Sequence, residues 1–227
     1  MLRLSGTTSF ALVFALALCA NPLFGQGQGV LQPDVDLIAN SGPFEFDGLG
    51  PGMNLGRSSV FDVSGGDFTI HAWVRFASLP ELPAPAMSIV DKIIGHNGPN
   101  EDGWRLIKEG NDNLFWFCLG GGSWNRCDPS VSTTVMSQTV AATDLWYSVA
   151  AVKTSSRISI YVNGVLEGSS FCDTFSDSNV ADLLVGANHD EGAYLDGQVG
   201  EVQLFKSALS APHVRALFEQ SKLRYRR

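Results

Sequence analysis

The sequence predicts an all-β protein, a two-sheet antiparallel sandwich or jelly roll with one short helix near the C-terminus. Apolar and polar residues alternate with a period of two along much of the chain, as side chains do on a half-buried strand. Clusters of Gly, Pro, Asn and Asp separate these segments at short intervals, which is typical of sandwiches. One segment near the C-terminus has helical spacing instead.

The N-terminal residues have the pattern of a secretion signal. One basic residue, Arg3, precedes an unbroken apolar run, Phe10–Ala20. The run fits the apolar region of a signal peptide, about 7–15 residues, and is shorter than the roughly 20 residues that cross a bilayer. We expect residues 1–25 to be a signal, cleaved near Ala20 or Gly25, and the mature chain to be secreted or periplasmic. A buried helix of the mature fold is the alternative.

Three segments carry the strand pattern most clearly. In Asp67–Phe76 one face is entirely apolar, and the other face carries His71, Trp73 and Arg75. Leu145–Lys153 and Arg157–Val162 follow, and Asn163-Gly164 is the strongest short hairpin signal, because type I′ turns need positive φ at both central positions. Further strands are expected at Phe44–Phe46, Ser59–Val63, Ser88–Ile94, Trp104–Lys108, Leu114–Leu119, Ala181–Val185 and Gln198–Lys206.

The predicted helix begins after Ser210, a good N-cap, with Pro212 in its first turn. Val214, Leu217 and Phe218 fall at i, i+3 and i+4, so they form one apolar stripe that we expect to pack against the sandwich.

Length and charge limit the classes of partner. Arg3 is the only charged residue before residue 26, so residues 26–227 carry 14 basic and 23 acidic residues. That balance argues against nucleic acid and anionic membranes, which require a basic surface. We interpret residues 26–41 as an N-terminal segment, 42–221 as one domain and 222–227 as a basic, solvated tail. No later segment reaches 18 consecutive apolar residues, so we expect no helical membrane span.

Three cysteines remain once Cys19 leaves with the signal. Asn113–Pro129 has the pattern of a hairpin that turns at residues 120–122, and this would bring Cys118 and Cys127 opposite each other. In an oxidising compartment we expect them to form a disulfide, which contributes on the order of 2–3 kcal/mol in the chain-entropy model. Cys172 is then left over, either buried or free. Three thiols without a CxxC pair do not make a structural zinc site.

Four short motifs occur in order along the chain. They are Phe46–Gly48 (FDG), Phe68–Val74 (FTIHAWV), Trp146–Gly164 (WYSVAAV to YVNG) and Val185–Ser210 (VG, then GEVQLF and ALS). Together they resemble the laminin-G-like, concanavalin A-like lectin/glucanase jelly-roll family. The resemblance implies a two-sheet antiparallel jelly-roll sandwich with a concave face. It also implies an adhesion, glycan-binding or protein-binding role, in many members with calcium. One position departs from the family pattern, because Gly200 stands where an Asp usually precedes the closing Glu.

A calcium site is one expectation. Calcium takes six to eight oxygen ligands, and oxygen-bearing side chains gather in the loop at residues 188–196. The resemblance makes the first and last strands neighbours, which would add one residue from each. The candidate ligands are Asp47, Asn188, Asp190, Glu191, Asp196 and Glu201. A solvated acidic loop is the alternative, and Gly200 would cost the site a ligand if the missing carboxylate holds the metal.

Two groups of residues are candidates for ligand binding. His71, Trp73 and Arg75 lie opposite the apolar stripe of their strand, where an aromatic ring could cover a sugar and polar groups could meet its hydroxyls. The alternative for Trp73 is a packing role. The second group, Trp116, Trp124 and Asn125, lies near the glycine turn at residues 120–122, and its alternative is a stabilised hairpin tip.

The sequence predicts no catalytic residues. Glycosidases need two carboxylates roughly 5–10 Å apart, and Glu45-Phe46-Asp47 is the only such fragment beside a strand, with no further Glu at strand spacing. GxSxG, HExxH and P-loop motifs are absent, and the histidines are scattered. We therefore expect a secreted, non-catalytic module that recognises a carbohydrate or a cell-surface protein, with calcium as its only candidate cofactor. A self-associating structural or adhesive domain is the first alternative, and a glycoside hydrolase of this fold is the second.

Overall fold

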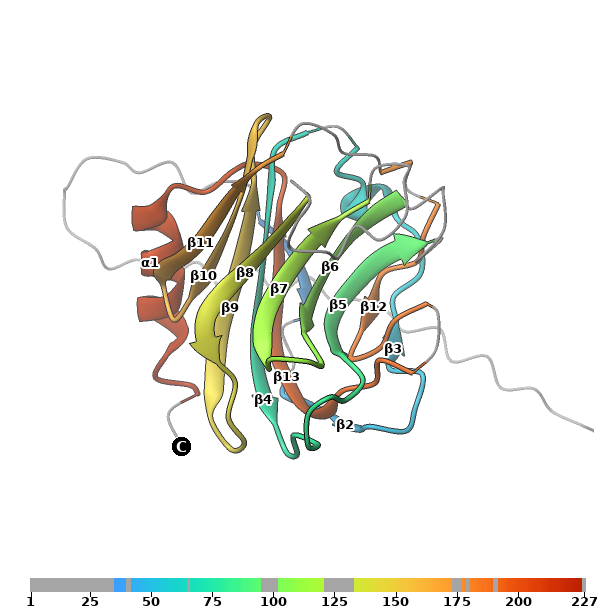
Figure 1. The fold of residues 1–227 in the computed structure, drawn as a ribbon. Coiled ribbons are helices and arrows are strands. Elements are labelled where there is room, and N and C mark those ends of the chain that lie inside the picture. The colour runs from blue at the N-terminus through green and yellow to red at the C-terminus, as the bar shows by residue number, and fades with distance from the viewer. Residues whose placement is uncertain are drawn as a thin grey trace, which may run out of the picture. The chain divides into compact units, whose positions relative to one another are not determined.

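A computed structural model (Figure 1) describes residues 35–39, 42–64, 66–94, 102–120, 133–172, 177–178, 180–189 and 192–225. All the helices and strands named below belong to one compact unit, Gln32–Arg227. The expected signal, residues 1–25, lies outside the described residues, so the signal and its cleavage site stay predictions. None of the described helices is long and apolar enough to cross a membrane.

Two antiparallel sheets form the fold, as the sequence predicts. The strands of the first sheet run in the order β1-β13-β4-β9-β10-β11, with β2 also paired to β13, and those of the second run β3-β12-β5-β6-β7-β8. The first sheet contains β1 (Val35–Ala39), β2 (Phe44–Asp47), β4 (Phe68–Phe76), β9 (Trp146–Lys153), β10 (Arg157–Val162), β11 (Val165–Phe171) and β13 (Asp196–Phe205). The second contains β3 (Met53–Asn54), β5 (Met87–Ile94), β6 (Asp102–Lys108), β7 (Leu114–Leu119), β8 (Thr134–Val140) and β12 (Leu184–Val185).

The core lies between the sheets and is built from the alternation seen in the sequence. The apolar face of β4 is fully buried, with Phe68, Ile70 and Phe76 all at 0% exposure. Phe68 contacts Trp104 of β6 and Phe117 of β7 across the sandwich, with ring centroids 5.6 Å and 6.0 Å apart. The stripe along β4 therefore faces the second sheet, and its other face points outward.

The Asn163-Gly164 turn forms as predicted. Both residues have positive φ, 50° and 77°, which the type I′ turn between β10 and β11 requires. The turn also lies against the helix, because a Cβ on Gly164 would be 3.1 Å from Cβ of Phe218.

Two expectations about the strands are wrong. The segment predicted as a strand at Ser59–Val63 contains the 3₁₀ helix η1 (Ser59–Phe61), because the Ser58 hydroxyl accepts a hydrogen bond from the Val60 amide and caps a helical turn. The hairpin pairing expected after β7 is also wrong. Cys118 of β7 already has a strand neighbour on each side, Arg105 of β6 and Thr134 of β8, so a third strand cannot pair with it there.

Helix α1 (Ala211–Ser221) packs on the outer face of the first sheet (Figure 1). Ser210 precedes it and Pro212 lies in its first turn, as expected. Val214 is 2% exposed and joins a cluster with Ala150, Tyr161 and Phe205 from the sheet's outer face. The helix therefore packs its apolar stripe against the sandwich, as expected, and covers part of the outer face of the first sheet.

Candidate ligand-binding site

The structure contradicts the exposed platform predicted around His71. This side chain is 0% exposed, with Nδ1 3.1 Å from Gln203 Oε1 and Nε2 2.9 Å from Ser148 Oγ. Burial lowers the pKa of His71 from 6.5 to about 4, so the ring is neutral at physiological pH. His71 is thus part of a buried hydrogen-bond network beneath the helix.

Trp73 is buried as well, at 2% exposure. Its ring stacks on Phe218 of α1 at 5.8 Å and on Tyr225 at 4.5 Å, and its Nε1–H donates to Ser221 Oγ over 2.9 Å. The packing alternative is therefore the correct one for Trp73. Alternation within β4 identified the outward face but carried no information about which element covers it.

The last residue of α1 and the four that follow it lie against the sheet, and we call Ser221–Tyr225 the C-terminal clasp. The Tyr225 ring contacts Trp73 and also Trp146, whose centroid is 4.8 Å away. The backbone N–H of Glu201 donates to the Tyr225 hydroxyl over 2.9 Å, and Arg224 Nη1 lies 2.8 Å from Glu201 Oε2. Burial raises the pKa of Tyr225. The expectation of a solvated tail is therefore wrong for Tyr225, which docks on the sheet, whereas Leu223 and Arg224 are exposed.

Gly200 makes this docking possible. A Cβ built at this position would lie 2.6 Å from the Tyr225 ring and hydroxyl, closer than non-bonded atoms approach. The absence of the family's Asp here therefore leaves room for Tyr225. Glu201 beside it is 6% exposed and paired with Arg224, and burial raises the pKa of its carboxyl although Arg224 lowers it in part.

A pocket of about 500 Å³ lies next to the clasp. Three of its side chains form one row across neighbouring strands, because Gln198 of β13 and Trp146 of β9 are both register partners of Arg75 of β4. The complete lining, which we call the Arg75–Trp146 pocket, is Pro43, Arg75, Trp146, Gln198, Arg224 and Tyr225. Its volume lies within the usual range for small-molecule sites, roughly 300–1,000 Å³.

Carboxylates outside the lining orient the polar side chains of this pocket. Arg75 Nη2 lies 2.5 Å from Asp144 Oδ1, and Arg75 Nη1 donates to Gln198 Oε1 over 3.2 Å. Gln198 Nε2 in turn donates to Glu45 Oε1 over 2.5 Å. Each polar group is thereby held from one side, which keeps the pocket wall in one arrangement before any ligand arrives.

Of the predicted ligand-binding residues, the structure places only Arg75 in this pocket. The other lining residues were missed because strand register, which puts Gln198 and Trp146 beside Arg75, is not visible in the sequence. Trp116 lies elsewhere, on the outer face of the second sheet, 7% exposed among Ile107 and Cys118. Its partners in the second predicted group, Trp124 and Asn125, lie outside the described residues, and so does Cys127, so the disulfide stays a prediction.

The expected calcium ligands are only partly brought together. Asp47 and Asp196 are register partners of β2 and β13 and both line a pocket of about 300 Å³. Asp47 Oδ1 accepts the amides of Leu49 and Gly50, and Ser78 donates to Asp196. Asn188 Oδ1 accepts the Ala193 amide over 3.3 Å.

Glu201 is not a member of this group. It lies five residues along β13 from Asp196, roughly 16 Å at strand spacing, and it is paired with Arg224. Asp190 and Glu191 lie outside the described residues. Within the described part of the chain, no group of three or more His, Cys, Asp or Glu side chains is placed to hold a metal. Calcium at Asp47 and Asp196 stays a prediction.

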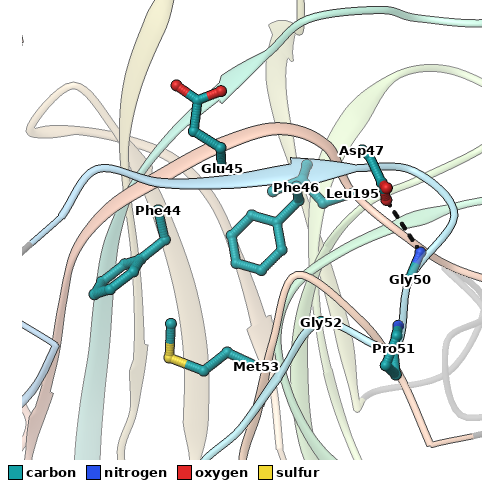
Figure 2. Close-up of a pocket in the computed structure, with 9 residues that line it drawn as sticks. All are labelled: Phe44, Glu45, Phe46, Asp47, Gly50, Pro51, Gly52, Met53 and Leu195. Atoms are coloured by element: carbon teal, nitrogen blue, oxygen red, sulfur yellow. Dashed lines mark hydrogen bonds between the residues drawn. The ribbon is translucent and has the colours of Figure 1, made fainter.

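A third pocket, of about 560 Å³, opens beside β2 and β3 (Figure 2). Phe44, Phe46 and Met53 gather on one side of β2, whereas the Glu45 carboxylate points to the other side (Figure 2). The Asp47 carboxylate bonds the Gly50 amide at 3.2 Å. The acidic fragment Glu45–Asp47 therefore does not present two carboxylates to this apolar pocket, and Glu45 instead orients Gln198.

Comparisons with known proteins agree with this architecture. Residues 47–215 match the family described as the concanavalin A-like lectin/glucanases superfamily. The carbohydrate-binding module CBM40 of Ruminococcus gnavus IT-sialidase, bound to α2,3-sialyllactose, is similar in structure. The TM-score is 0.62 at 15% identity, over 81% of this chain and 99% of that one. No curated protein matches the sequence.

Two longer proteins contain a similar fold. The binding domain of Paraclostridial Mosquitocidal Protein 1 gives a TM-score of 0.58 at 14% identity, over 83% of this chain and 47% of that one. Trypanosoma rangeli sialidase gives 0.53 at 18% identity, over 80% of this chain and 28% of that one. The chain thus spans less than half of either protein, and the likeness at these identities is one of fold.

Proposed function

The chain belongs to the concanavalin A-like lectin/glucanase superfamily, and from this premise we propose that it is a secreted, non-catalytic carbohydrate-binding module. The Arg75–Trp146 pocket carries the proposal. It combines two partly exposed aromatic rings, Trp146 and Tyr225, with guanidinium and amide groups that are already oriented. Sugar recognition requires this combination, because a ring covers the apolar face of a pyranose while polar groups meet its hydroxyls.

Similarity to CBM40 over nearly its full length supports a binding module rather than part of a catalytic domain. The lining supports the non-catalytic assignment. Hydrolysis of a glycosidic bond uses an acid and a second carboxylate, and the residues lining the Arg75–Trp146 pocket include no Asp or Glu.

Glycan binding by the mature chain, residues 26–227, is tested on a glycan microarray and by titration calorimetry with the sugars that bind. Trp146→Ala should weaken binding by about tenfold or more, since stacking of an aromatic ring and its buried area contribute at least about 1.4 kcal/mol. Tyr194→Ala is the matched control and should leave affinity unchanged. It removes a half-buried aromatic side chain from the 300 Å³ pocket that Asp47 and Asp196 line. Binding that survives Trp146→Ala would place the ligand elsewhere, and hydrolysis of any bound glycan would overturn the non-catalytic assignment.

Three finer features belong to the same proposal. Export by the signal at residues 1–25 is checked by N-terminal sequencing of the secreted protein. A disulfide between Cys118 and Cys127 is checked by non-reducing peptide mapping; separate, alkylatable thiols in the exported protein would exclude it. Calcium at Asp47 and Asp196 is proposed as a structural aid to the loop at residues 188–196.

An edge of the first sheet favours a second candidate function, self-association. Among the described strands β11 pairs only with β10, and it carries Val165, Leu166 and Phe171 at 60%, 50% and 67% exposure. Gln138 of β8 bonds Glu167 at the other edge of β11, and an edge strand whose apolar side chains stay exposed is still a template for pairing with another copy. Sedimentation of the wild type and Leu166→Lys over a range of concentrations decides this; a wild-type monomer at every concentration excludes it.

A further inference from the structure

We infer that the Arg75–Trp146 pocket selects a sugar that carries a carboxylate, such as a hexuronic or nonulosonic acid. The inference rests on the proposed function, since it names the class of sugar for the same pocket. It is drawn from the charge and hydrogen-bonding character of the lining.

The ionisable lining residues favour an anion. Two of the six are arginines, Arg75 and Arg224, and none is acidic, although the whole chain has 23 acidic and 15 basic residues. The two guanidinium groups come from β4 and from the C-terminal clasp, and the fold brings them to one pocket. Arginine is the side chain best suited to a carboxylate, because its planar fork donates two parallel hydrogen bonds.

The hydrogen-bonding capacity of the lining points the same way. The Gln198 carbonyl oxygen already accepts from Arg75, and the Tyr225 hydroxyl already accepts from the Glu201 amide. Arginine has five N–H donors and no acceptor. Among the described contacts, Arg75 uses two nitrogens on Asp144 and Gln198, and Arg224 uses one on Glu201. The donors that remain need acceptors, and a carboxylate supplies them more strongly than a neutral hydroxyl.

The carboxylates around the pocket set how this selection works. Asp144, Glu201 and Glu45 lie behind Arg75, Arg224 and Gln198 respectively, and they offset the long-range charge of the arginines. Selection therefore comes from short-range, directed hydrogen bonds to guanidinium groups that are already oriented. Affinity for the acidic sugar should consequently fall only moderately with added salt, because oriented contact pairs are screened less than distant charges.

The test is titration calorimetry of residues 26–227 with four sugars. Methyl glucuronide and N-acetylneuraminic acid provide two different acidic rings, and the methyl ester of each is its neutral counterpart. We expect one acidic sugar to bind about tenfold or more tightly than its neutral counterpart, as a charged hydrogen-bond pair contributes about 1.5–3 kcal/mol. The two acidic arms separate a uronic from a nonulosonic ligand.

Arginine variants localise the effect. Arg75→Gln and Arg224→Gln should each remove most of the preference for the acidic sugar, so that its affinity approaches that of the neutral counterpart. Arg224 is 62% exposed in its side chain, and the amide of Arg224→Gln can still donate to Glu201, so this variant should disturb the fold less than Arg75→Gln in β4. Arg57→Gln, an exposed arginine paired with Asp182 outside the pocket, is the matched control and should keep the preference.

The outcomes are distinguishable. Equal binding of neutral and acidic sugars, lost in Trp146→Ala, overturns this inference and leaves the proposed function standing. A preference that persists in both Arg75→Gln and Arg224→Gln also overturns it. Absence of binding to any glycan, on the array and in calorimetry, overturns the inference and the proposed function together.

Discussion

Gly200→Ala should undock the C-terminal clasp. The new methyl carbon would lie 2.6 Å from the Tyr225 ring and hydroxyl, so the ring must move away from β13. Three contacts weaken as a result: the stacking on Trp73, the contact with Trp146, and the bond from the Glu201 amide. Aromatic pairs contribute about 0.5–1.5 kcal/mol each and the hydrogen bond about 1 kcal/mol. We expect a loss of about 2–3 kcal/mol, which is a fall of about 4–12 °C in Tm for a chain of this size.

A double-mutant cycle separates this clash from other effects of the substitution. Tyr225→Ala should cost a similar 2–3 kcal/mol by itself, since it removes the same contacts. In the Tyr225→Ala background, Gly200→Ala should then cost less than about 0.5 kcal/mol, because the atoms it would meet are gone. Urea denaturation of the four proteins measures both values. Fully additive costs, or a Gly200→Ala variant as stable as the wild type, would refute the assignment of Gly200 as the space that admits Tyr225.

Three further predictions concern other parts of the fold. The folded state holds His71 at a pKa of about 4 against 6.5 in the unfolded chain, so only the unfolded state takes up a proton between those values. Stability should be complete above pH 6.5 and fall by up to about 3 kcal/mol as the pH drops toward 4. The fall should be smaller in His71→Gln. Urea denaturation at several pH values measures it, and an equal dependence of the unfolding free energy on pH in both proteins would exclude this. Lys92→Met should cost about 3–5 kcal/mol in chemical denaturation, because it removes the ammonium group that pairs with the buried Asp177 carboxylate 2.8 Å away; a cost near that of an exposed lysine would contradict it. If calcium binds Asp47 and Asp196, a chelator should lower Tm in the wild type but not in Asp196→Asn, and an unchanged wild-type midpoint would sink the calcium proposal.

The fold was predictable because its determinants are local. The alternation along β4 specifies one buried face whatever strand lies beside it, and Asn163-Gly164 specifies a turn from two residues. Expectations failed where a short segment had a local alternative, as at Ser59, where a capping hydroxyl stabilises a 3₁₀ turn. The hairpin after β7 failed for a different reason, because a more distant strand, β8, occupies the edge it needed.

The site was predictable only in part because it depends on contacts between distant segments. Alternation correctly placed Arg75 on the outward face, and the same reasoning placed Trp73 there. What separates the two is the C-terminal clasp, which covers Trp73 and stops short of covering Arg75. The basic residues of the clasp suggested a solvated tail, and nothing in the local sequence shows that Tyr225 docks against a glycine more than twenty residues earlier.

The clasp links ligand binding to the stability of the C-terminus. Arg224 and Tyr225 are two of the six lining residues, so the pocket is complete only while the clasp is docked. Docking of the clasp and binding of the sugar are therefore coupled. If the docked clasp strengthens sugar binding by some free energy, the bound sugar stabilises the docked clasp by the same amount. Gly200→Ala should therefore weaken sugar binding as well as stability, although Gly200 does not line the pocket, and saturating ligand should recover part of the lost Tm. Gly200 thus has two consequences. It takes the place of a carboxylate expected in β13, and it leaves the space into which Tyr225 docks to complete the candidate site.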